Sequence, residues 1–403
     1  MPATDAPIML VAGEASGDLH GATLCRALRA LAPGRPLLGM GGERMAAAGF
    51  ERLADVTAAA VTGGTEAFGP LPILFRAWRC LRAALRGPRR PAALVLIDFP
   101  EFNLRLARVA RRAGIPVVYF IPPQVWAWRP WRARVVARRA SLVLAIFPFE
   151  VALYRAAGAR VEFIGHPVLD ALAEAPTREA ARRGLGLDPG ERVVGLLPGS
   201  RAHEIERTLP VLHAAAARIA AARPATRFVL AAVAGGSPDP ATLLGGAPPV
   251  QVVRGDTYAV MRAADLLLVN SGTATLEAAL LGTPTVVCYR MSRLSEAWVR
   301  LLVRVPWIAL PNITLGRRVV PELYQRAFTT EAVAVEALRL LDTPAVRAAQ
   351  REAFEELAGV LGEPGVGHRA AQRILALADR HEAGSQPREM EAAAHAAPAP
   401  DAS

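Results

Sequence analysis

The sequence predicts an α/β protein built from two doubly wound, Rossmann-like domains. Short aliphatic runs without polar alternation recur along the chain, and alanine-rich helical stretches separate them. Unbroken apolar strands of this kind are typical of parallel sheets that helices cover on both faces. The series occurs twice, with Pro, Gly and charged residues clustered between the two copies around residues 177–192. We therefore expect a first domain over residues 1–185 and a second over residues 186–380.

The expected strands follow one another with helical sequence between them. In the first domain they are expected over residues 7–12, 36–39, 92–97, 116–121, 141–146 and 161–164. In the second domain they are expected over residues 192–197, 227–232, 250–253, 265–269 and 284–289. The last helices of the second domain either stay with it or return to the first domain. Residues 381–403 are of low complexity, so we expect a disordered tail there.

The composition excludes several kinds of chemistry. The chain has 403 residues, 52% of them hydrophobic, and a formal net charge of +11. All 47 basic residues are arginine, and no lysine is present. This excludes Schiff-base catalysis by a lysine, a P-loop with its lysine, and pyridoxal phosphate held on a lysine. Any bound phosphate group is therefore expected to contact arginine, backbone N–H groups or helix N-termini.

The positive charge is concentrated in the first half of the chain. Residues 1–170 contain 22 arginines against 12 acidic residues, whereas residues 171–403 contain 25 against 24. Within residues 76–139 there are 15 arginines against only Asp98 and Glu101. A local excess of this kind indicates an anionic partner. Nucleic acid is one alternative, but no RNP, KH or helix-turn-helix pattern accompanies the charge, so we do not expect it.

A predicted helix over residues 68–90 combines apolar and basic residues. Its apolar stripe and the arginines beside it make the following candidate membrane or acyl-chain contacts: Leu74, Trp78, Arg79, Leu81 and Arg82. An apolar stripe flanked by arginines is typical of a helix that lies in an anionic lipid interface. The alternative is an ordinary surface helix whose apolar face packs into the protein core.

Cysteine usage and hydropathy favour a cytoplasmic protein that is soluble or peripheral. Cys25, Cys80 and Cys288 are scattered, which favours a reducing compartment and argues against a thiolate metal site. The first residues lack the basic segment of a signal peptide. The longest charge-free run, residues 113–128, is shorter than the ~20 apolar residues that a membrane span needs.

The first expected strand leads into a glycine-rich turn over residues 13–21. Such a turn lets a ligand approach the backbone at a helix N-terminus, which makes Glu14, Ser16 and Gly17 candidate ligand contacts. The spacing is not G-x-G-x-x-G, so a dinucleotide fingerprint is poorly supported. A tight strand-to-helix turn without a ligand is the alternative.

Asp98 follows the expected strand over residues 92–97, at the edge where open α/β sheets bind ligands. Its apolar neighbours Ile97, Phe99 and Phe102 desolvate the carboxylate, which would raise its pKa toward that of a useful base. Nearby arginines would lower the pKa instead, and the sequence does not decide the balance. The alternative is a helix N-cap aspartate, because Pro100 suits the first turn of a helix.

The second domain carries two turns suited to a diphosphate. The first contains Gly199 for the bend, Ser200 as a donor and Arg201 as the cation. The second supplies small polar residues at a helix start: Asn270, Ser271, Gly272, Thr273 and Thr275. Glu277, in the first turns of that helix, is placed to accept hydrogen bonds from a ribose diol. Together the two turns predict a nucleotide-diphosphate site.

No Asp-x-Asp spacing, which a metal-dependent sugar-nucleotide enzyme would use to hold a divalent ion, occurs in the chain. We therefore expect no metal and no cofactor. In a sugar-nucleotide enzyme without a metal, the diphosphate that leaves the sugar would have its negative charge neutralised by arginine and by the N-terminal end of a helix dipole.

Seven blocks of sequence together resemble the lipid-A-disaccharide synthase family. They are AGEASGDLHGA (12–22), IDFPEFN (97–103), VWAWR (125–129), FIGHPVLDA (163–171), LLPGSRAHEIE (196–206), SGTATLEAALLGTPTVVCYRM (271–291) and ALPNI (309–313). The blocks stand in the family's order and span roughly residues 8–375. The resemblance implies a metal-independent, inverting hexosyltransferase of the GT-B fold, with two domains facing a central cleft.

The resemblance also implies roles for individual residues. Asp98 matches the favoured general base, and Arg201 matches a functionally sensitive arginine. The turn with Glu277 matches the uridine-diphosphate site, and the loop with Glu14 matches one that faces the cleft. Three short segments depart from the family pattern and affect only the detail of the acceptor pocket: Pro122-Pro123-Gln124, Asn270, and Phe99-Pro100-Glu101.

The implied reaction joins UDP-2,3-diacylglucosamine to 2,3-diacylglucosamine 1-phosphate in lipid A biosynthesis, the pathway that supplies the anchor of lipopolysaccharide. The products are the lipid A disaccharide 1-phosphate and UDP. The expected partners are these two substrates and the anionic inner face of the inner membrane, and a homodimer is kept open. The alternative is another GT-B sugar-nucleotide enzyme, such as an N-acetylglucosaminyltransferase or a UDP-GlcNAc 2-epimerase.

Overall fold

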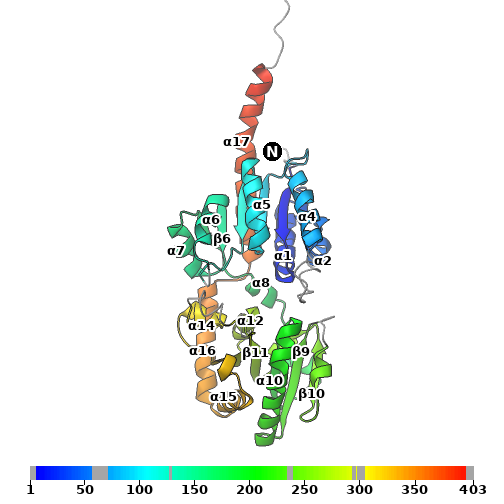
Figure 1. Cartoon of the computed structure of the whole chain (residues 1–403), viewed down its shortest axis with the longest axis vertical. Coiled ribbons are helices and arrows are strands. Elements are labelled where there is room, and N and C mark those ends of the chain that lie inside the picture. Colours follow the sequence, from blue (N-terminus) through cyan, green and yellow to red (C-terminus); the bar gives the residue numbers. More distant parts are fainter. Residues whose placement is uncertain are drawn as a thin grey trace, which may run out of the picture. The chain divides into compact units, whose positions relative to one another are not determined.

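The computed structural model describes residues 6–56, 71–126, 129–233, 239–292, 296 and 305–395. The chain divides into two compact units, each of which is an α/β domain (Figure 1). Unit 1 consists of Met1–Val125, Pro130–Pro167 and Gly365–Ser403, and unit 2 consists of Trp126–Arg129 and Val168–Pro364. Residues 168–185, which we expected in the first domain, therefore belong to unit 2.

Unit 1 is built on a seven-stranded parallel sheet in the order β3-β2-β1-β4-β5-β6-β7. Its strands are β1 (Ile8–Ala12), β2 (Leu37–Met40), β3 (Glu51–Ala54), β4 (Ala93–Ile97), β5 (Val117–Phe120), β6 (Leu142–Ala145) and β7 (Val161–Phe163). Its helices are α1 (Ala15–Leu31), α2 (Glu43–Ala47), α4 (Leu71–Ala84), α5 (Pro100–Arg112), α6 (Arg132–Arg139), α7 (Pro148–Ala156) and α17 (Val366–His395). The central strands are wholly buried, as their unbroken apolar sequence requires.

Unit 2 is built on a six-stranded parallel sheet in the order β10-β9-β8-β11-β12-β13. Its strands are β8 (Arg192–Leu197), β9 (Thr226–Ala232), β10 (Val250–Arg254), β11 (Leu266–Asn270), β12 (Thr285–Tyr289) and β13 (Glu322–Tyr324). Its α-helices are α8 (Val168–Leu172), α9 (Arg178–Gly184), α10 (Ala202–Ala222), α11 (Thr257–Ala263), α12 (Thr273–Leu280), α14 (Leu310–Leu315), α15 (Thr330–Asp342) and α16 (Pro344–Leu361). The described part of the unit also contains two short 3-10 helices, η1 (Pro240–Leu243) and η2 (Gln325–Ala327).

The predicted fold class of two Rossmann-like α/β domains is confirmed, and every expected strand is present. The sequence did not predict the edge strands β3 and β13. Both are short, and β3 has the sequence ERLA with two exposed charged residues, so it lacks the apolar run that marks a buried strand.

The last helix, α17, packs against α1 in unit 1. The largely buried Arg35 pairs with Asp379 at 2.9 Å and also with Glu382. The helix continues to His395, so residues 381–395, where we expected a disordered tail, are helical, and residues 396–403 lie outside the described residues.

The apolar stripe of α4 packs into the core of unit 1. Leu81 is 0% exposed, and Leu74 and Trp78 pack against the same core cluster. The Trp78 ring also contacts the Phe102 ring edge to face, with centroids 5.7 Å apart. The predicted lipid contact of Leu81 is therefore wrong, because the protein covers that side chain, whereas Leu74 and Trp78 are partly exposed and their lipid contact stays a prediction. Arg79 and Arg82 are exposed, and residues 68–70 lie outside the described residues.

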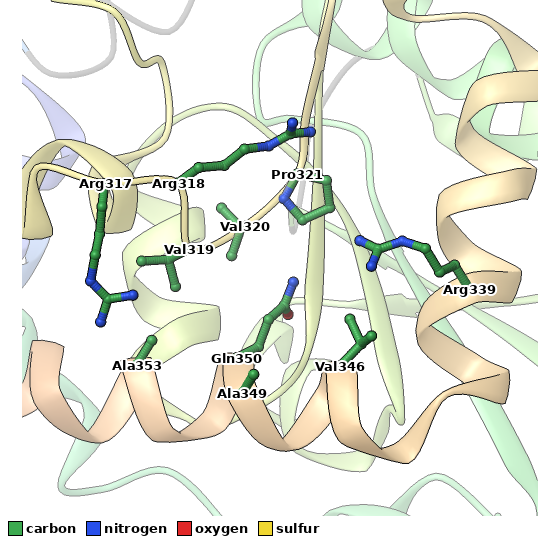
Figure 2. A pocket seen from close by; sticks show the side chains of 10 residues that line it. All are labelled: Arg317, Arg318, Val319, Val320, Pro321, Arg339, Val346, Ala349, Gln350 and Ala353. Carbon is green, nitrogen blue, oxygen red and sulfur yellow. The ribbon is translucent and has the colours of Figure 1, made fainter.

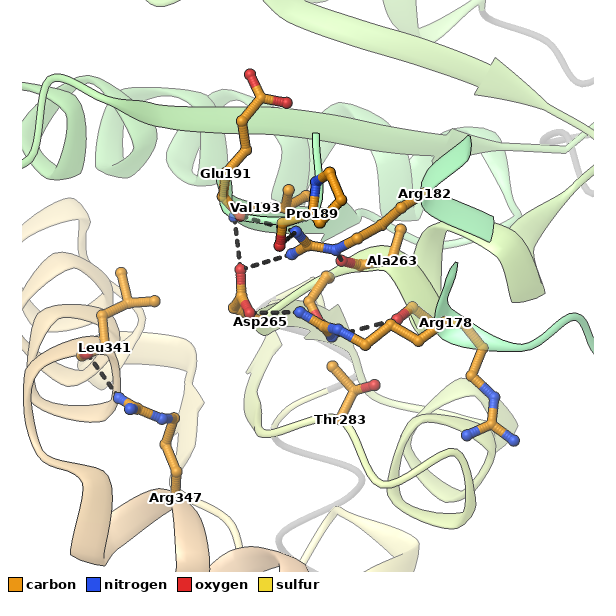
Figure 3. Close-up of polar contacts among 12 residues, drawn as sticks. Arg178, Arg182, Pro189, Glu191, Val193, Ala263, Asp265, Thr283, Leu341 and Arg347 are labelled. Atoms are coloured by element: carbon orange, nitrogen blue, oxygen red, sulfur yellow. Dashed lines mark hydrogen bonds and ion pairs between the residues drawn. The ribbon is translucent and has the colours of Figure 1, made fainter. Parts of the chain in front are cut away.

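An arginine pair fastens α9 to the sheet of unit 2. Figure 3 shows Asp265, which precedes β11, between Arg178 and Arg182. The Arg182 side chain is buried and donates to Asp265 Oδ2 at 3.0 Å and to the carbonyls of Ala263, Asp188, Pro189 and Glu191. One guanidinium thus joins α9 to Asp265 and to four backbone carbonyls.

We predict that Arg182→Leu lowers the free energy of unfolding by about 3 kcal/mol, because it removes a buried guanidinium that pairs with Asp265 and donates to four carbonyls. Urea unfolding followed by circular dichroism measures this. The matched control is the neighbouring exposed Arg183, whose replacement by Leu should change stability by less than about 0.5 kcal/mol. Equal losses for the two variants would contradict the role of Arg182.

Candidate active site

Glu14 and Asp98 follow two neighbouring strands at the carboxyl edge of the unit 1 sheet. The register pairs Ala12 of β1 with Ile97 of β4, so the residues that follow these strands lie side by side. Burial, together with the negative charge of Glu14, raises the pKa of Asp98 to about 6, while the Phe99 N–H lowers it. A partly desolvated carboxylate with this pKa is suited to general-base catalysis near neutral pH.

Asp98 does not cap the helix that follows it. Phe99 is the cap residue of α5, and Pro100 is its first residue, as the sequence suggested for Pro100. Asp98 and Phe99 both have a φ of +46°, in the left-handed region that residues with a Cβ rarely adopt. Consecutive residues in this conformation at the end of a strand are typical of a functional site, where the surroundings maintain the strain.

The ring of Phe99 lies directly over Gly13. A Cβ atom on Gly13 would be 2.3 Å from Phe99 Cδ1, so only glycine allows this approach. Phe99 also stacks on Phe102, with ring centroids 5.7 Å apart. Sequence reasoning missed the role of Gly13, although the glycine-rich turn that contains it was noted.

The other candidate residues of the glycine-rich turn over residues 13–21 differ in how far they are exposed. Gly17 is buried, and a Cβ on it would be 3.3 Å from the Ala12 Cβ, so it lets α1 approach β1 closely. Ser16 is exposed in the first turn of α1, and Glu14 is half-buried immediately before that helix. Ser16 and Glu14 are therefore open to a ligand, whereas Gly17 shapes the turn.

The two expected diphosphate turns lie side by side at the carboxyl edge of the unit 2 sheet. Strands β8 and β11 pair with each other, with Leu197 opposite Val269. Gly199 has a φ of +119°, and a Cβ on it would be 3.0 Å from Asn270 Nδ2. The structure therefore brings Gly199 and Asn270 together, as the sequence predicted for the turns that contain them.

Glu204 organises the first of these turns. Its Oε2 atom accepts hydrogen bonds from the backbone N–H groups of Ser200 at 3.1 Å and Arg201 at 3.3 Å. Its Oε1 atom pairs with Arg201 Nη1 at 3.2 Å. These backbone donors are thus occupied by the protein, and the groups left for a phosphate are the Ser200 hydroxyl and the rest of the Arg201 guanidinium. Both residues are exposed.

The second turn is held by its own hydroxyl groups. Ser271 Oγ donates to the Ile308 carbonyl at 2.8 Å, and Thr275 Oγ1 donates to the Gly272 carbonyl at 2.8 Å. Both hydroxyls therefore shape the turn, and the nearly buried Asn270 lies 3.5 Å from the Thr208 hydroxyl. Gly272 and Thr273 remain exposed at the N-terminus of α12, where partial positive charge favours an anion.

Glu277 shares its carboxylate with a tyrosine that sequence reasoning missed. Tyr258, in α11, donates its hydroxyl to Glu277 Oε1 at 3.0 Å. Burial raises the pKa of Glu277, and the hydrogen bond from Tyr258 opposes this. The contact orients one carboxylate oxygen and leaves Oε2 to accept from a diol.

In the described part of the chain, no group of three or more His, Cys, Asp or Glu side chains is placed to hold a metal ion. No helix among the described residues is long and apolar enough to cross a membrane.

Two hollows in unit 2 lie away from the predicted site residues. One, of about 360 Å³, lies between α16 and the segment before β13 (Figure 2). The other, of about 830 Å³, lies at the starts of β8 and β9. Neither is lined by a residue of the two carboxyl-edge turns.

Two parallel α/β domains with polar turns at their carboxyl edges are typical of GT-B glycosyltransferases and related epimerases. Solved structures show the same fold. A putative UDP-N-acetylglucosamine 2-epimerase from Listeria monocytogenes matches with a TM-score of 0.65 and 15% identity, covering 94% of this chain and 97% of that one. The calicheamicin glycosyltransferase CalG4 matches with a TM-score of 0.58 and 19% identity, covering 94% of this chain and 99% of that one.

Sequence comparison identifies the family. The family model described as lipid-A-disaccharide synthetase matches residues 8–363. A lipid-A-disaccharide synthase from Geobacter sulfurreducens is 41% identical over 371 residues, which are 91% of this chain and 96% of that protein. One from Anaeromyxobacter dehalogenans strain 2CP-C is 42% identical over 375 residues, with coverage of 91% and 96%. The chain belongs to the lipid-A-disaccharide synthase family, which confirms the resemblance seen in the sequence.

Proposed function

We propose that this chain is an inverting glycosyltransferase of lipid A biosynthesis. It transfers 2,3-diacylglucosamine from UDP to the 6-hydroxyl of 2,3-diacylglucosamine 1-phosphate and releases UDP. Family membership over residues 8–363 is the observation that carries this function. The half-buried Asp98 at a carboxyl edge supplies the base that the reaction needs.

The proposed chemistry uses one base and one activated leaving group. The oxygen of the acceptor 6-hydroxyl forms a bond to the anomeric carbon as the bond from that carbon to UDP breaks. The proton of the hydroxyl passes to Asp98, and UDP leaves with the bonding electron pair. Attack on the face opposite the leaving group inverts the anomeric centre, and one carboxylate serves as base, as in inverting glycoside chemistry.

We assign the nucleotide to unit 2. Arg201 and the N-terminus of α12 at Gly272 and Thr273 would stabilise the negative charge that develops on the diphosphate. The pairing of Arg201 with Glu204 supports this assignment, because it holds the guanidinium before the substrate arrives. Glu277, oriented by Tyr258, would accept hydrogen bonds from the ribose.

The epimerase alternative is not better supported. Epimerases share the fold with TM-scores of about 0.6, but their identity to this chain is 12–15%, which shows the fold alone. The relatives with more than 40% identity are named lipid-A-disaccharide synthase.

We predict that the purified protein converts the two acylated sugars into a tetraacyl disaccharide 1-phosphate and UDP, as mass spectrometry of the products would show. Asp98→Asn should lower kcat by ~10² or more, because a general base typically contributes this much. UDP affinity, measured by calorimetry, should be unchanged because the nucleotide contacts are on unit 2. Turnover of a UDP-sugar without any acceptor would instead support the epimerase, and wild-type activity of Asp98→Asn would reject the base.

We also propose that unit 1 associates peripherally with the anionic inner face of the inner membrane. Phe75 is 62% exposed on α4, and Arg79 and Arg82, four and seven residues further along the same helix face, are exposed as well. Exposed apolar side chains beside arginines suit the interface of an anionic bilayer. This face differs from the buried stripe that the sequence suggested. The homodimer stays a prediction, because the structure is of one chain.

We predict that the triple variant Phe75→Ser, Arg79→Glu and Arg82→Glu no longer floats with vesicles that contain anionic phospholipid. Each arginine near the surface contributes about 1 kcal/mol to such binding, and reversing the charge repels the bilayer. The matched control on exposed unit 2 residues is Val335→Ser, Arg318→Glu and Arg351→Glu, which makes the same change in charge and likewise replaces one exposed apolar side chain by serine. Flotation of the α4 variant at the level of this control would contradict the proposed face.

A further inference from the structure

The backbone carbonyl of Asp98 is held by two buried side chains from neighbouring elements. We infer that Tyr119 and Asn103 are positioning residues, which fix the direction of the Asp98 carboxylate by holding its main chain in the left-handed conformation. The inference rests on the proposed role of Asp98 as the base, and it adds two residues that act through Asp98 without touching substrate.

Tyr119 holds the carbonyl from the adjacent strand. It lies in β5, which pairs with β4 in the register Leu96 with Tyr119 and Ile97 with Phe120. The Tyr119 side chain is 1% exposed, and its hydroxyl donates to the Asp98 carbonyl oxygen at 2.9 Å. The Asp98 N–H in turn donates to the Ile121 carbonyl at 3.2 Å. Main-chain groups on both sides of Asp98 are thus tied to β5 and the residue that follows it.

Asn103 holds the same carbonyl from the first turn of α5. It is 0% exposed, and its Nδ2 atom donates to the carbonyl oxygens of Asp98 at 2.8 Å, Ile97 at 3.2 Å and Val11 at 3.4 Å. The Asn103 Oδ1 atom is buried and has no hydrogen-bond partner among the described residues. Burying the Asn103 Oδ1 atom without a hydrogen-bond partner costs free energy. The hydrogen bonds that Nδ2 donates at the end of β4 are the stabilising contacts that offset this cost.

These contacts matter because the backbone at Asp98 is strained. Both Asp98 and Phe99 have a φ of +46°, and a residue with a Cβ relaxes toward negative φ when nothing restrains it. A rotation about these bonds would turn the Cβ of Asp98, and with it the carboxylate, away from its present direction. A small displacement of a base from the proton that it accepts lowers the rate steeply.

A merely structural tyrosine would behave differently, and the chain offers one as a control. Tyr154 is also 0% exposed in unit 1, and its hydroxyl donates to the Pro123 carbonyl at 2.7 Å. Tyr119→Phe and Tyr154→Phe therefore each remove one buried hydrogen bond from a hydroxyl to a carbonyl, and both keep the ring. Only the first bond ends on Asp98.

The experiment is a double-mutant cycle on the full-length protein, with kcat, KM for the UDP-sugar and UDP affinity as readouts. We expect Tyr119→Phe to lower kcat about tenfold more than Tyr154→Phe does, with KM and UDP affinity within about twofold of wild type. In the Asp98→Asn background, Tyr119→Phe should change kcat by less than about twofold, because a residue that acts through Asp98 has nothing left to position.

The outcomes separate this inference from the proposed function. If Asp98→Asn keeps wild-type activity, the base assignment fails and the inference falls with it. If Asp98→Asn is impaired but Tyr119→Phe matches Tyr154→Phe, or lowers kcat equally in both backgrounds, only the positioning role is overturned. Should Tyr119→Phe fail to fold, as thermal unfolding would show, Asn103→Leu takes its place in the same cycle with the same expectations.

Discussion

Parallel pairing of strands determines where the candidate site residues of this protein lie. Because β1 and β4 run in the same direction, the turns that carry Glu14 and Asp98 reach the same edge of the unit 1 sheet. The pairing of β8 with β11 does the same for Gly199 and Asn270 in unit 2. In each unit, the pairing of parallel strands therefore places residues that are distant in sequence next to each other at one sheet edge.

Neighbouring charged groups have different effects at the carboxyl edges of the two sheets. In unit 1, burial and the neighbouring Glu14 raise the pKa of Asp98 and so strengthen it as a base, even though arginines are abundant in the same half of the chain. In unit 2, Glu204 pairs with Arg201 and accepts two backbone N–H groups, which fixes a cation and a turn together. Because the chain has no lysine, carboxylates, arginine and main-chain N–H groups make the polar contacts at both edges.

Sequence reasoning predicted the features that depend on local pattern. The unbroken strands, the turns that follow them and the position of Asp98 all followed from the order of residues along short segments. It did not predict what covers an apolar face: periodicity showed the stripe of α4, but only packing shows that Leu81 faces the core and Phe75 faces outward. Contacts across sequence distance were also missed. Tyr119 lies 21 residues from Asp98, and nothing in either segment indicates that the hydroxyl meets that carbonyl.

The capture of backbone donors by Glu204 illustrates a further limit. A glycine-bearing turn before a helix resembles an open phosphate site in sequence, whether or not a carboxylate three residues on accepts its N–H groups. Here that carboxylate does so, and the open donors are the side chains of Ser200 and Arg201. Ser200 and Arg201 therefore stay in the predicted site, but through their side chains and not through their backbone N–H groups.

The most direct test of Asp98 as a desolvated base is the pH dependence of kcat/KM, which reports ionisations of the free enzyme. A carboxyl group accepts a proton only when ionised, and the pKa of Asp98 is raised to about 6, so kcat/KM should fall as the pH drops through about 6 and level off above about 7. The residual activity of Asp98→Asn should lose this acid limb, whereas a limb that arises from the substrate phosphate would persist. A wild-type kcat/KM that stays constant from pH 8 to about pH 5, or an acid limb that survives in Asp98→Asn, would contradict the assignment.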